Sequence, residues 1–365
     1  MERVVENVQA LSDIELAVLL CLVADQHCII EANEQLLGEL VAETRIITAD
    51  VFGLTCSVLD CSERTTLDDF GNGILVEDTG VGYFSSDLGK DGEDLPYLDS
   101  VKYSERRAFK SPRPFGALDS RRIANVVIAK NLDRATQQVQ VQALELIRGK
   151  RNFTRTAVHA APRPFLFIAL NNTGTGRLTS HLNDHFFISH RHYPEDGLPN
   201  LEDLRLKESP SDDDVSTSSV VRNSPRPNQK RKSSAPLFSP EDIAKLATLT
   251  SEVRISSEVR AYLHNIVVFM RLHRAVAGGI SAMATRHFDT LAHALAPLHG
   301  ISYVSPSLVA LAARKIYPHR IIITAPENER SMQWGSSLEA VKAVLEGVTA
   351  EDVIEEVLQS VEAPL

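Results

Sequence analysis

The chain has 365 residues, 43% of them hydrophobic and 24% charged, which is the balance of a globular protein long enough for two or three domains. Its formal net charge of −10 argues against nucleic acid or an anionic membrane as a partner attracted by overall charge. Four cysteines form no CxxC pair, so we expect reduced buried thiols and no metal site.

The longest strongly apolar stretch, residues 16–24, has about half the length that a membrane-spanning helix needs. Acidic residues precede it, where a signal peptide would carry basic ones. We therefore expect a cytoplasmic or nuclear protein that does not contact a membrane.

Residues 1–204 alternate short β-branched runs with amphipathic segments, which predicts a mainly parallel α/β sheet with flanking helices. The expected strands are Cys28–Glu31, Thr55–Leu59, Gly73–Glu77, Asn125–Ala129 and Phe165–Leu170. The expected helices are Leu11–Ala24, Gln35–Thr44 and Gln138–Gly149.

Residues 205–237 are rich in serine, proline and charge and have no apolar face, so we expect a disordered linker. The run Lys230-Arg231-Lys232 matches a nuclear-import signal, and it also matches a solvated run of charge. Both interpretations stay open.

Residues 238–365 follow a helical pattern throughout and predict an all-α domain. Ser239-Pro240-Glu241-Asp242 offers an N-cap, a proline in the first turn and a capping-box carboxylate. An apolar stripe runs from Ser257 to Ala277, and further helices are expected to start at Ser281, at Ser305-Pro306 and at Thr349.

This order of elements, together with several short motifs, resembles the AAA+ ATPases of the MoxR and magnesium-chelatase subunit I type. The motifs are Leu132-Asp133-Arg134-Ala135, the helix around Val139–Glu145, the strand Pro164–Asn172, and the lid-like runs 262–281 and 299–321. The resemblance implies an AAA+-like parallel sheet with flanking helices, followed by a helical lid domain. It also implies assembly with a protein partner or into a homo- or hetero-oligomer.

The resemblance identifies the positions at which the family binds and hydrolyses ATP, and most of them carry other residues here. The phosphate-binding loop falls on residues 32–39, with Ala32, Gln35 and Gly38 at its defining positions. The two carboxylates that end the neighbouring strand become Lys130 and Asn131. The sensor asparagine is kept as Asn172, whereas the family's two arginines become His185 and Met283.

Elementary electrostatics indicates that these changes abolish the chemistry. An ammonium group about 5 Å from Mg²⁺ costs roughly 6–7 kcal/mol at an effective dielectric constant of about 20. An amide at Asn131 cannot act as a general base. The glycines near Gly89-Lys90 have the wrong spacing for a phosphate loop and predict a surface loop.

Two functions remain open at this point. The first is a scaffold or assembly subunit with a degraded nucleotide site, for which no cofactor is expected. The second is a working ATPase that uses ATP and Mg²⁺ with non-standard or partner-supplied residues. Nucleic-acid binding rests only on residues 222–232, and the histidines at 181, 185, 190 and 192 match no standard metal spacing.

Overall fold

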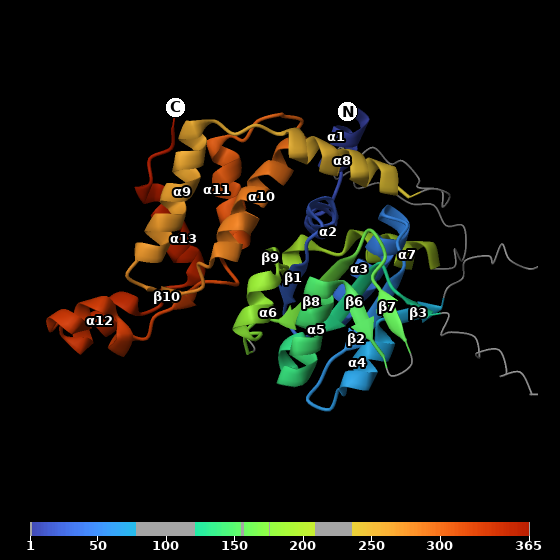
Figure 1. The fold of residues 1–365 in the computed structure, drawn as a ribbon, viewed down its shortest axis with the longest axis horizontal. Helices are drawn as coiled ribbons and strands as arrows, with labels where there is room; N and C mark the ends of the chain where they lie inside the picture. Colours follow the sequence, from blue (N-terminus) through green and yellow to red (C-terminus); the bar gives the residue numbers. More distant parts are fainter. Residues whose placement is uncertain (1, 78–120, 155–156, 175, 209–235, 365) are drawn as a thin grey trace, which may run out of the picture.

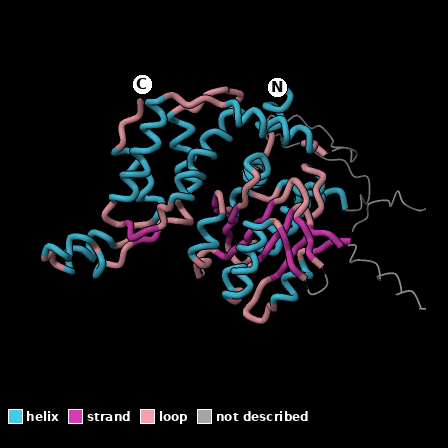
Figure 2. Tube along the Cα trace, viewed as in Figure 1, coloured by secondary structure: helices cyan, strands magenta, loops and turns pink. Residues whose placement is uncertain are grey.

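The structure is a computed structural model that describes residues 2–77, 121–154, 157–174, 176–208 and 236–364. An α/β body formed by the earlier residues lies beside a group of helices formed by the later ones (Figure 1). Figure 2 shows the strands gathered almost wholly in the α/β body, as the sequence predicts.

The α/β body is built on a five-stranded sheet in the order β2-β5-β8-β1-β9, and every neighbouring pair is parallel. The strands are β1 (Cys28–Ala32), β2 (Cys56–Asp60), β5 (Val126–Lys130), β8 (Leu166–Asn172) and β9 (Ile188–Arg191). The prediction of a mainly parallel α/β sheet is therefore confirmed.

Alternating side chains of the strands divide the core of this sheet into two layers. Ile30, Ile128 and Ile168 face the layer that also holds residues of α2 (Asp13–Ala24) and α3 (Leu37–Ile46). Their neighbours in sequence face the layer formed with α5 (Gln137–Gly149) and α6 (Ser180–His185). Both faces of the sheet are covered, which explains why its strands read as continuous apolar runs.

One predicted strand does not belong to the parallel sheet. Helix α4 (Leu67–Gly73) starts with a capping box at Thr66 and takes up Gly73, and the remaining strand β3 is only Leu75–Glu77. It pairs antiparallel with β4 (Arg121–Ile123). Its side chains are not buried, so no core holds it in the main sheet.

The other short elements of the α/β body connect or flank the sheet. They are α1 (Glu2–Gln9), the π-turn η1 (Ile47–Val51), the 3₁₀ turns η2 (Leu132–Arg134) and η3 (Pro194–Asp196), the antiparallel pair β6 (Arg151–Phe153) and β7 (Val158–Ala160), and α7 (Pro199–Glu208). Helix α7 extends past residue 204, the predicted end of this domain.

The later part of the chain is mainly helical, as predicted. Its helices are α8 (Pro240–Glu252), α9 (Ser257–Leu272), α10 (Ala282–Leu298), α11 (Pro306–Ile316), α12 (Leu338–Leu345) and α13 (Ala350–Ser360). Serine or threonine caps start α8, α10, α11 and α13 at the predicted residues. The turns η4 (Pro326–Asn328) and η5 (Arg330–Trp334) precede α12.

The apolar stripe from Ser257 does not stay helical as far as Ala277. Helix α9 ends at Leu272, and β10 (Val276–Gly278) pairs antiparallel with β11 (Ile322–Ile323). Pairing with a distant strand satisfies the backbone of this segment, and local periodicity does not reveal it.

Helix α2 joins the two bodies. Nine of its twelve residues are buried, and it lies between the sheet and the helices α8 and α10. Because it is apolar on all sides, one continuous core runs from the sheet through α2 into the helical domain.

Candidate functional site

The positions that the sequence assigns to nucleotide chemistry fall in two places. At the carboxyl edge of the sheet, Ala32 at the end of β1 pairs in register with Asn172 at the end of β8. Lys130 ends β5, which lies on the other side of β8. Parallel α/β sheets bind ligands at this edge. The structure therefore brings Ala32, Lys130, Asn131 and Asn172 to one edge, with Gln35 and Gly38 just beyond β1.

The segment after β1 is a tight turn rather than an open loop. The Leu36 N–H donates to Asn33 O at 2.9 Å, and Leu37 is buried as helix α3 begins. Gln35 is exposed in this turn, and Gly38 lies in the first turn of α3 with open space around its Cα. Residues 32–39 contain no lysine, and Gly38 is the second residue of α3.

Acidic side chains surround this turn, and each has a basic partner. Glu34 lies 3.0 Å from Arg134, and Glu39 lies 2.8 Å from Arg205. Glu39 also lies in the first turn of α3, where its carboxylate interacts favourably with the positive end of the helix dipole. The place where an anion would approach α3 therefore carries a carboxylate of the chain itself.

Lys130 and Asn131 are both held by the last residue of β2. Lys130 Nζ lies 3.2 Å from Asp60 Oδ2, and Asn131 Nδ2 donates to Asp60 Oδ1 at 3.2 Å. Asn131 adopts a left-handed conformation with φ of 54°, which asparagine tolerates better than most residues. Asp60 was not among the positions that the sequence singled out, because cross-strand pairing is not visible in a sequence.

Two carboxylates, those of Asp60 and Asp133, lie near Cys61 at this edge of the sheet. Both carboxylate oxygens of Asp133 are buried without a hydrogen-bond partner among the described residues. Burial, followed by the nearby carboxylates of Asp60 and Asp133, raises the pKa of the Cys61 thiol to about 12. Because the unpartnered groups are hydrogen-bond acceptors, this edge of the sheet disfavours phosphate.

The second group of positions lies where the α/β body meets the helical domain. His185 ends α6, next to His27 at the amino end of β1, and its Nδ1 lies 2.9 Å from His181 O. Met283 is half-buried in the first turn of α10, whose N-cap Ser281 donates to Asp184 Oδ1 at 2.6 Å. His185 and Met283 thus belong to elements that contact each other, away from Lys130.

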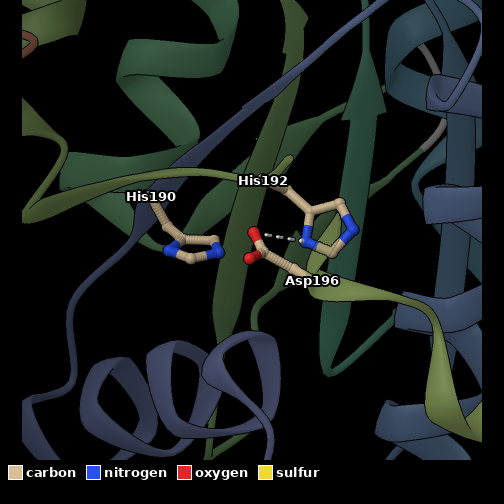
Figure 3. A group of neighbouring side chains, drawn as sticks. All are labelled: His190, His192 and Asp196. Atoms are coloured by element: carbon tan, nitrogen blue, oxygen red, sulfur yellow. Dashed lines mark ion pairs between the residues drawn. The ribbon is translucent and has the colours of Figure 1, made fainter. Parts of the chain in front are cut away.

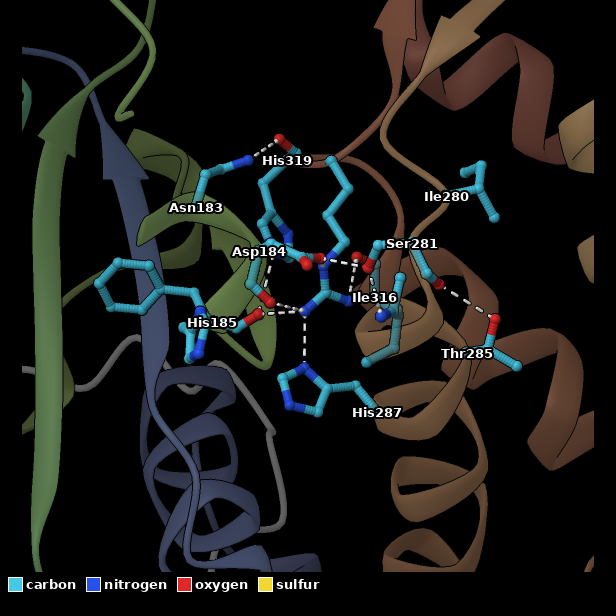
Figure 4. A network of polar contacts seen from close by, with 12 residues as sticks. Asn183, Asp184, His185, Ile280, Ser281, Thr285, His287, Ile316 and His319 are labelled. Atoms are coloured by element: carbon cyan, nitrogen blue, oxygen red, sulfur yellow. Dashed lines mark hydrogen bonds and ion pairs between the residues drawn. The ribbon is translucent and has the colours of Figure 1, made fainter. Parts of the chain in front are cut away.

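A buried arginine organises this junction. Arg320 is 2% exposed and donates to the backbone oxygens of Asp184, Phe186 and Ile316. Its guanidinium also donates to His287 Nδ1 at 2.7 Å, while its Nε lies 3.6 Å from Asp184 Oδ1. Figure 4 shows Asp184 of α6 facing the N-cap Ser281 and His287 of α10 at this point.

A cavity of about 620 Å³ opens beside this junction, between α6 and the β10–α10 turn. Its lining includes Arg177, Arg271, Arg320 and Arg330 and only one acidic residue, Asp184. None of the nucleotide positions predicted from the sequence lines it. The cavity is therefore suited to an anionic group that approaches from outside the chain.

The histidine run separates into two pairs. His181 and His185 lie in α6, whereas His190 and His192 lie at the carboxyl end of β9, close to Asp196. The spacing of the histidines alone does not include Asp196, which reaches them only because the chain turns through η3. The run Lys230-Arg231-Lys232 and the glycines near Lys90 lie outside the described residues.

Within the described ranges, no helix is both long and apolar enough to cross a membrane. Residues 268–341 match the AAA lid domain. These residues run from the end of α9 through α10 and α11 into α12, which is the region that forms the junction with the α/β body.

Two catalogued proteins match parts of the chain. "Maintenance of telomere capping protein 2" of Lachancea thermotolerans is 29% identical over 109 residues, which is 28% of this chain and 38% of that protein. "Uncharacterized protein YeaC" of Bacillus subtilis is 28% identical over 130 residues, 36% of this chain and 36% of that protein. Each alignment thus spans well under half of the relative's own length.

Among solved structures, a protein of Cytophaga hutchinsonii with a provisional assignment as an ATPase superimposes with a TM-score of 0.63 at 16% identity. The superposition covers 100% of this chain and 94% of that one. Taken with the sheet order and the lid match, it establishes that the chain has the fold of an AAA+ ATPase, completed by an AAA lid domain.

Proposed function

We propose that this chain is an AAA+ subunit of the MoxR or magnesium-chelatase type that no longer binds nucleotide productively and acts as a scaffold or assembly subunit. The observation that carries the proposal is the charge distribution at the carboxyl edge of the sheet. By position Gly38 takes the place of the phosphate-binding lysine, Glu39 lies in the first turn of α3, and Asp60 pairs with Lys130 at the end of β5.

The contacts of Lys130 also support the proposal. A metal-binding position must carry an anionic or neutral oxygen ligand, and Mg²⁺ binds through such ligands. Lys130 instead forms an ion pair with Asp60, and an ammonium group is not a ligand for a metal ion. Asn131 donates its amide to the same carboxylate and offers no base for water.

Calorimetric titration of the purified full chain with ATP, with and without Mg²⁺, tests this proposal. We expect no saturable heat that depends on Mg²⁺. One equivalent of Mg²⁺-dependent ATP binding would refute the loss of the nucleotide site. A mass measurement of the particle in the same buffer would show whether the chain assembles without nucleotide.

The cationic cavity supports a second candidate, a subunit of a mixed ring that contributes arginines to an active neighbour. Arg271 and Arg330 line the cavity together with Arg177, and an exposed guanidinium can stabilise charge on a phosphoryl group of another subunit. If this candidate is right, particles purified with their partners hydrolyse ATP, and Arg271→Ala lowers the rate. Arg260→Ala, at an arginine of α9 that does not line the cavity, is the matched control.

We propose that the protein acts in the cytoplasm or in the nucleus. The Lachancea thermotolerans relative is named for the maintenance of telomere capping. We propose that Lys230-Arg231-Lys232 directs import of this chain. A tagged variant in which all three become alanine should lose nuclear enrichment, and an unchanged distribution would dismiss this role.

A further inference from the structure

Two histidines and one aspartate meet at the end of strand β9 (Figure 3). His190 and His192 are two residues apart along an extended backbone, so their side chains lie on the same face of the chain. The turn η3 then returns Asp196, which accepts a hydrogen bond from the Tyr193 N–H at 2.8 Å. One potential ligand atom from each of the three residues lies within 4.8 Å of the other two.

The two imidazoles are buried, and one ring nitrogen of each lacks a hydrogen-bond partner within the described part of the chain. His190 is 5% exposed and His192 is 4% exposed. His190 Nε2 and His192 Nδ1 have no partner among the described residues. A buried polar atom without a partner costs about 1–3 kcal/mol, so two such atoms side by side indicate a missing ligand.

Two other buried histidines, His27 and His287, have a hydrogen-bond partner at Nδ1, whereas the Nδ1 of buried His319 has none among the described residues. His27 Nδ1 accepts a hydrogen bond from the Phe167 N–H at 3.1 Å. His287 Nδ1 accepts one from Arg320. In both, the chain itself satisfies the buried nitrogen, which it does not do for His190 Nε2 and His192 Nδ1.

We propose that His190, His192 and Asp196 bind a divalent transition-metal cation of the Zn²⁺ class. Imidazole nitrogen and carboxylate oxygen are ligands that such cations prefer. Mg²⁺ and Ca²⁺ take oxygen ligands instead and are not expected here. The site is distinct from the nucleotide positions, because none of its residues belongs to them.

The geometry requires a small closure. Bonds of about 2.0–2.2 Å to a tetrahedral Zn²⁺ place ligand atoms about 3.3 Å apart. The present separations of up to 4.8 Å must therefore shorten by about 1.5 Å. Rotation of Asp196, whose side chain is 35% exposed and lies 3.8 Å from His192 Nδ1, provides much of this movement. Three protein ligands leave one position for water or a substrate group.

Charged groups of both signs act on His190. Besides His192 and Asp196, the charged groups that act on His190 are Asp13 of α2 and Lys315 of α11. Lys315 repels a metal ion, whereas the two carboxylates attract it.

Metal titration of the full chain tests the proposal after removal of any histidine tag and treatment with a chelator. We expect one equivalent of Zn²⁺, retained through desalting, and a visible absorption band when Co²⁺ replaces it. Excess Mg²⁺ should not compete. Absence of stoichiometric Zn²⁺ and Co²⁺ binding would overturn the proposal.

Variants locate the bound metal. Asp196→Asn and His192→Ala should each weaken Zn²⁺ binding by at least about tenfold, since even residues outside the ligand shell contribute this much. Asp196→Asn alters an exposed side chain, so it still tests metal binding if His192→Ala fails to fold. The control is His293→Ala, because His293 lies 3.8 Å from Asp289 in α10, an isolated pair with the same separation. Equal binding by Asp196→Asn and wild type would show that the metal lies elsewhere.

Discussion

At the scale of single residues, two arginines of this chain differ in whether water could hydrogen-bond to their partners if the arginine were removed. Arg320 is enclosed at the junction between the α/β body and the lid, where it satisfies three backbone oxygens and His287. Arg314 forms a two-point contact with Glu355 on the surface, where both side chains are nearly half exposed. Only the first arginine leaves buried acceptors behind when it is removed.

We therefore expect Arg320→Ala to lower the free energy of unfolding by about 3–5 kcal/mol, the cost of breaking a buried charged network. Arg314→Ala should cost at most about 1 kcal/mol, as surface ion pairs do. Urea unfolding of both variants measures the difference. If both cost the same, Arg320 does not organise the junction.

At the scale of elements, the turn between β10 and α10 depends on one glycine. Gly279 has φ of +100°, and a Cβ atom there would lie 1.9 Å from the backbone oxygen of Arg320. This close approach keeps the turn against the segment that carries Arg320. Its neighbour Gly278 has open space where a Cβ would lie and an ordinary φ.

The two adjacent glycines provide a matched test. Gly279→Ala should lower the free energy of unfolding by about 3 kcal/mol, because it adds a backbone clash to a conformation that alanine rarely adopts. Gly278→Ala should change it by less than about 0.5 kcal/mol. Thermal unfolding of the two variants measures the difference in stability. If Gly279→Ala is as stable as the wild type, the turn can adopt another backbone conformation.

At the scale of the whole molecule, buried neutral histidines make stability depend on pH. Burial, followed by the charge of Lys150, lowers the pKa of His27 from 6.5 to about 3, and burial and then Arg320 lower that of His287 to about 3. Both rings accept a hydrogen bond at Nδ1, which an imidazolium cannot do. Between about pH 3 and pH 6.5, the folded-state and ordinary pKa values, these histidines bind more protons in the unfolded chain than in the folded one.

Stability should therefore decrease as the pH falls from 6.5 toward about 3, by about 1.4 kcal/mol per pH unit for each such histidine. His27→Asn keeps an acceptor for the Phe167 N–H but does not titrate, so its stability should depend less steeply on pH. Urea unfolding across this range measures the slope. The exposed His264 provides the control variant His264→Asn, whose slope should match that of the wild type.

The sequence predicted correctly those elements whose boundaries are set by local sequence pattern. Strands β1, β5 and β8 lie within about two residues of their predicted ranges, because buried parallel strands read as unbroken apolar runs. The caps at Ser239 and Thr349 were also correct, since capping is a local interaction. Gly73–Glu77 was wrong as a strand of the sheet, because its place depends on pairing with β4.

The candidate sites show the same division. Position along the chain was enough to find Lys130 and Asn131 at the end of a strand. It did not reveal Asp60, which comes from a neighbouring strand and pairs with both. Likewise, the sequence shows the spacing of His190 and His192, whereas the turn that returns Asp196 is a property of the fold.

The burial of α2 limits how an AAA lid attached in this way can swing. A rotation of the lid would expose buried side chains of α2, which packs against α8 and α10. Uncovering three such side chains costs about 5–9 kcal/mol, which is comparable to the whole stability of many domains. A large swing of the lid away from α2 is therefore energetically unfavourable.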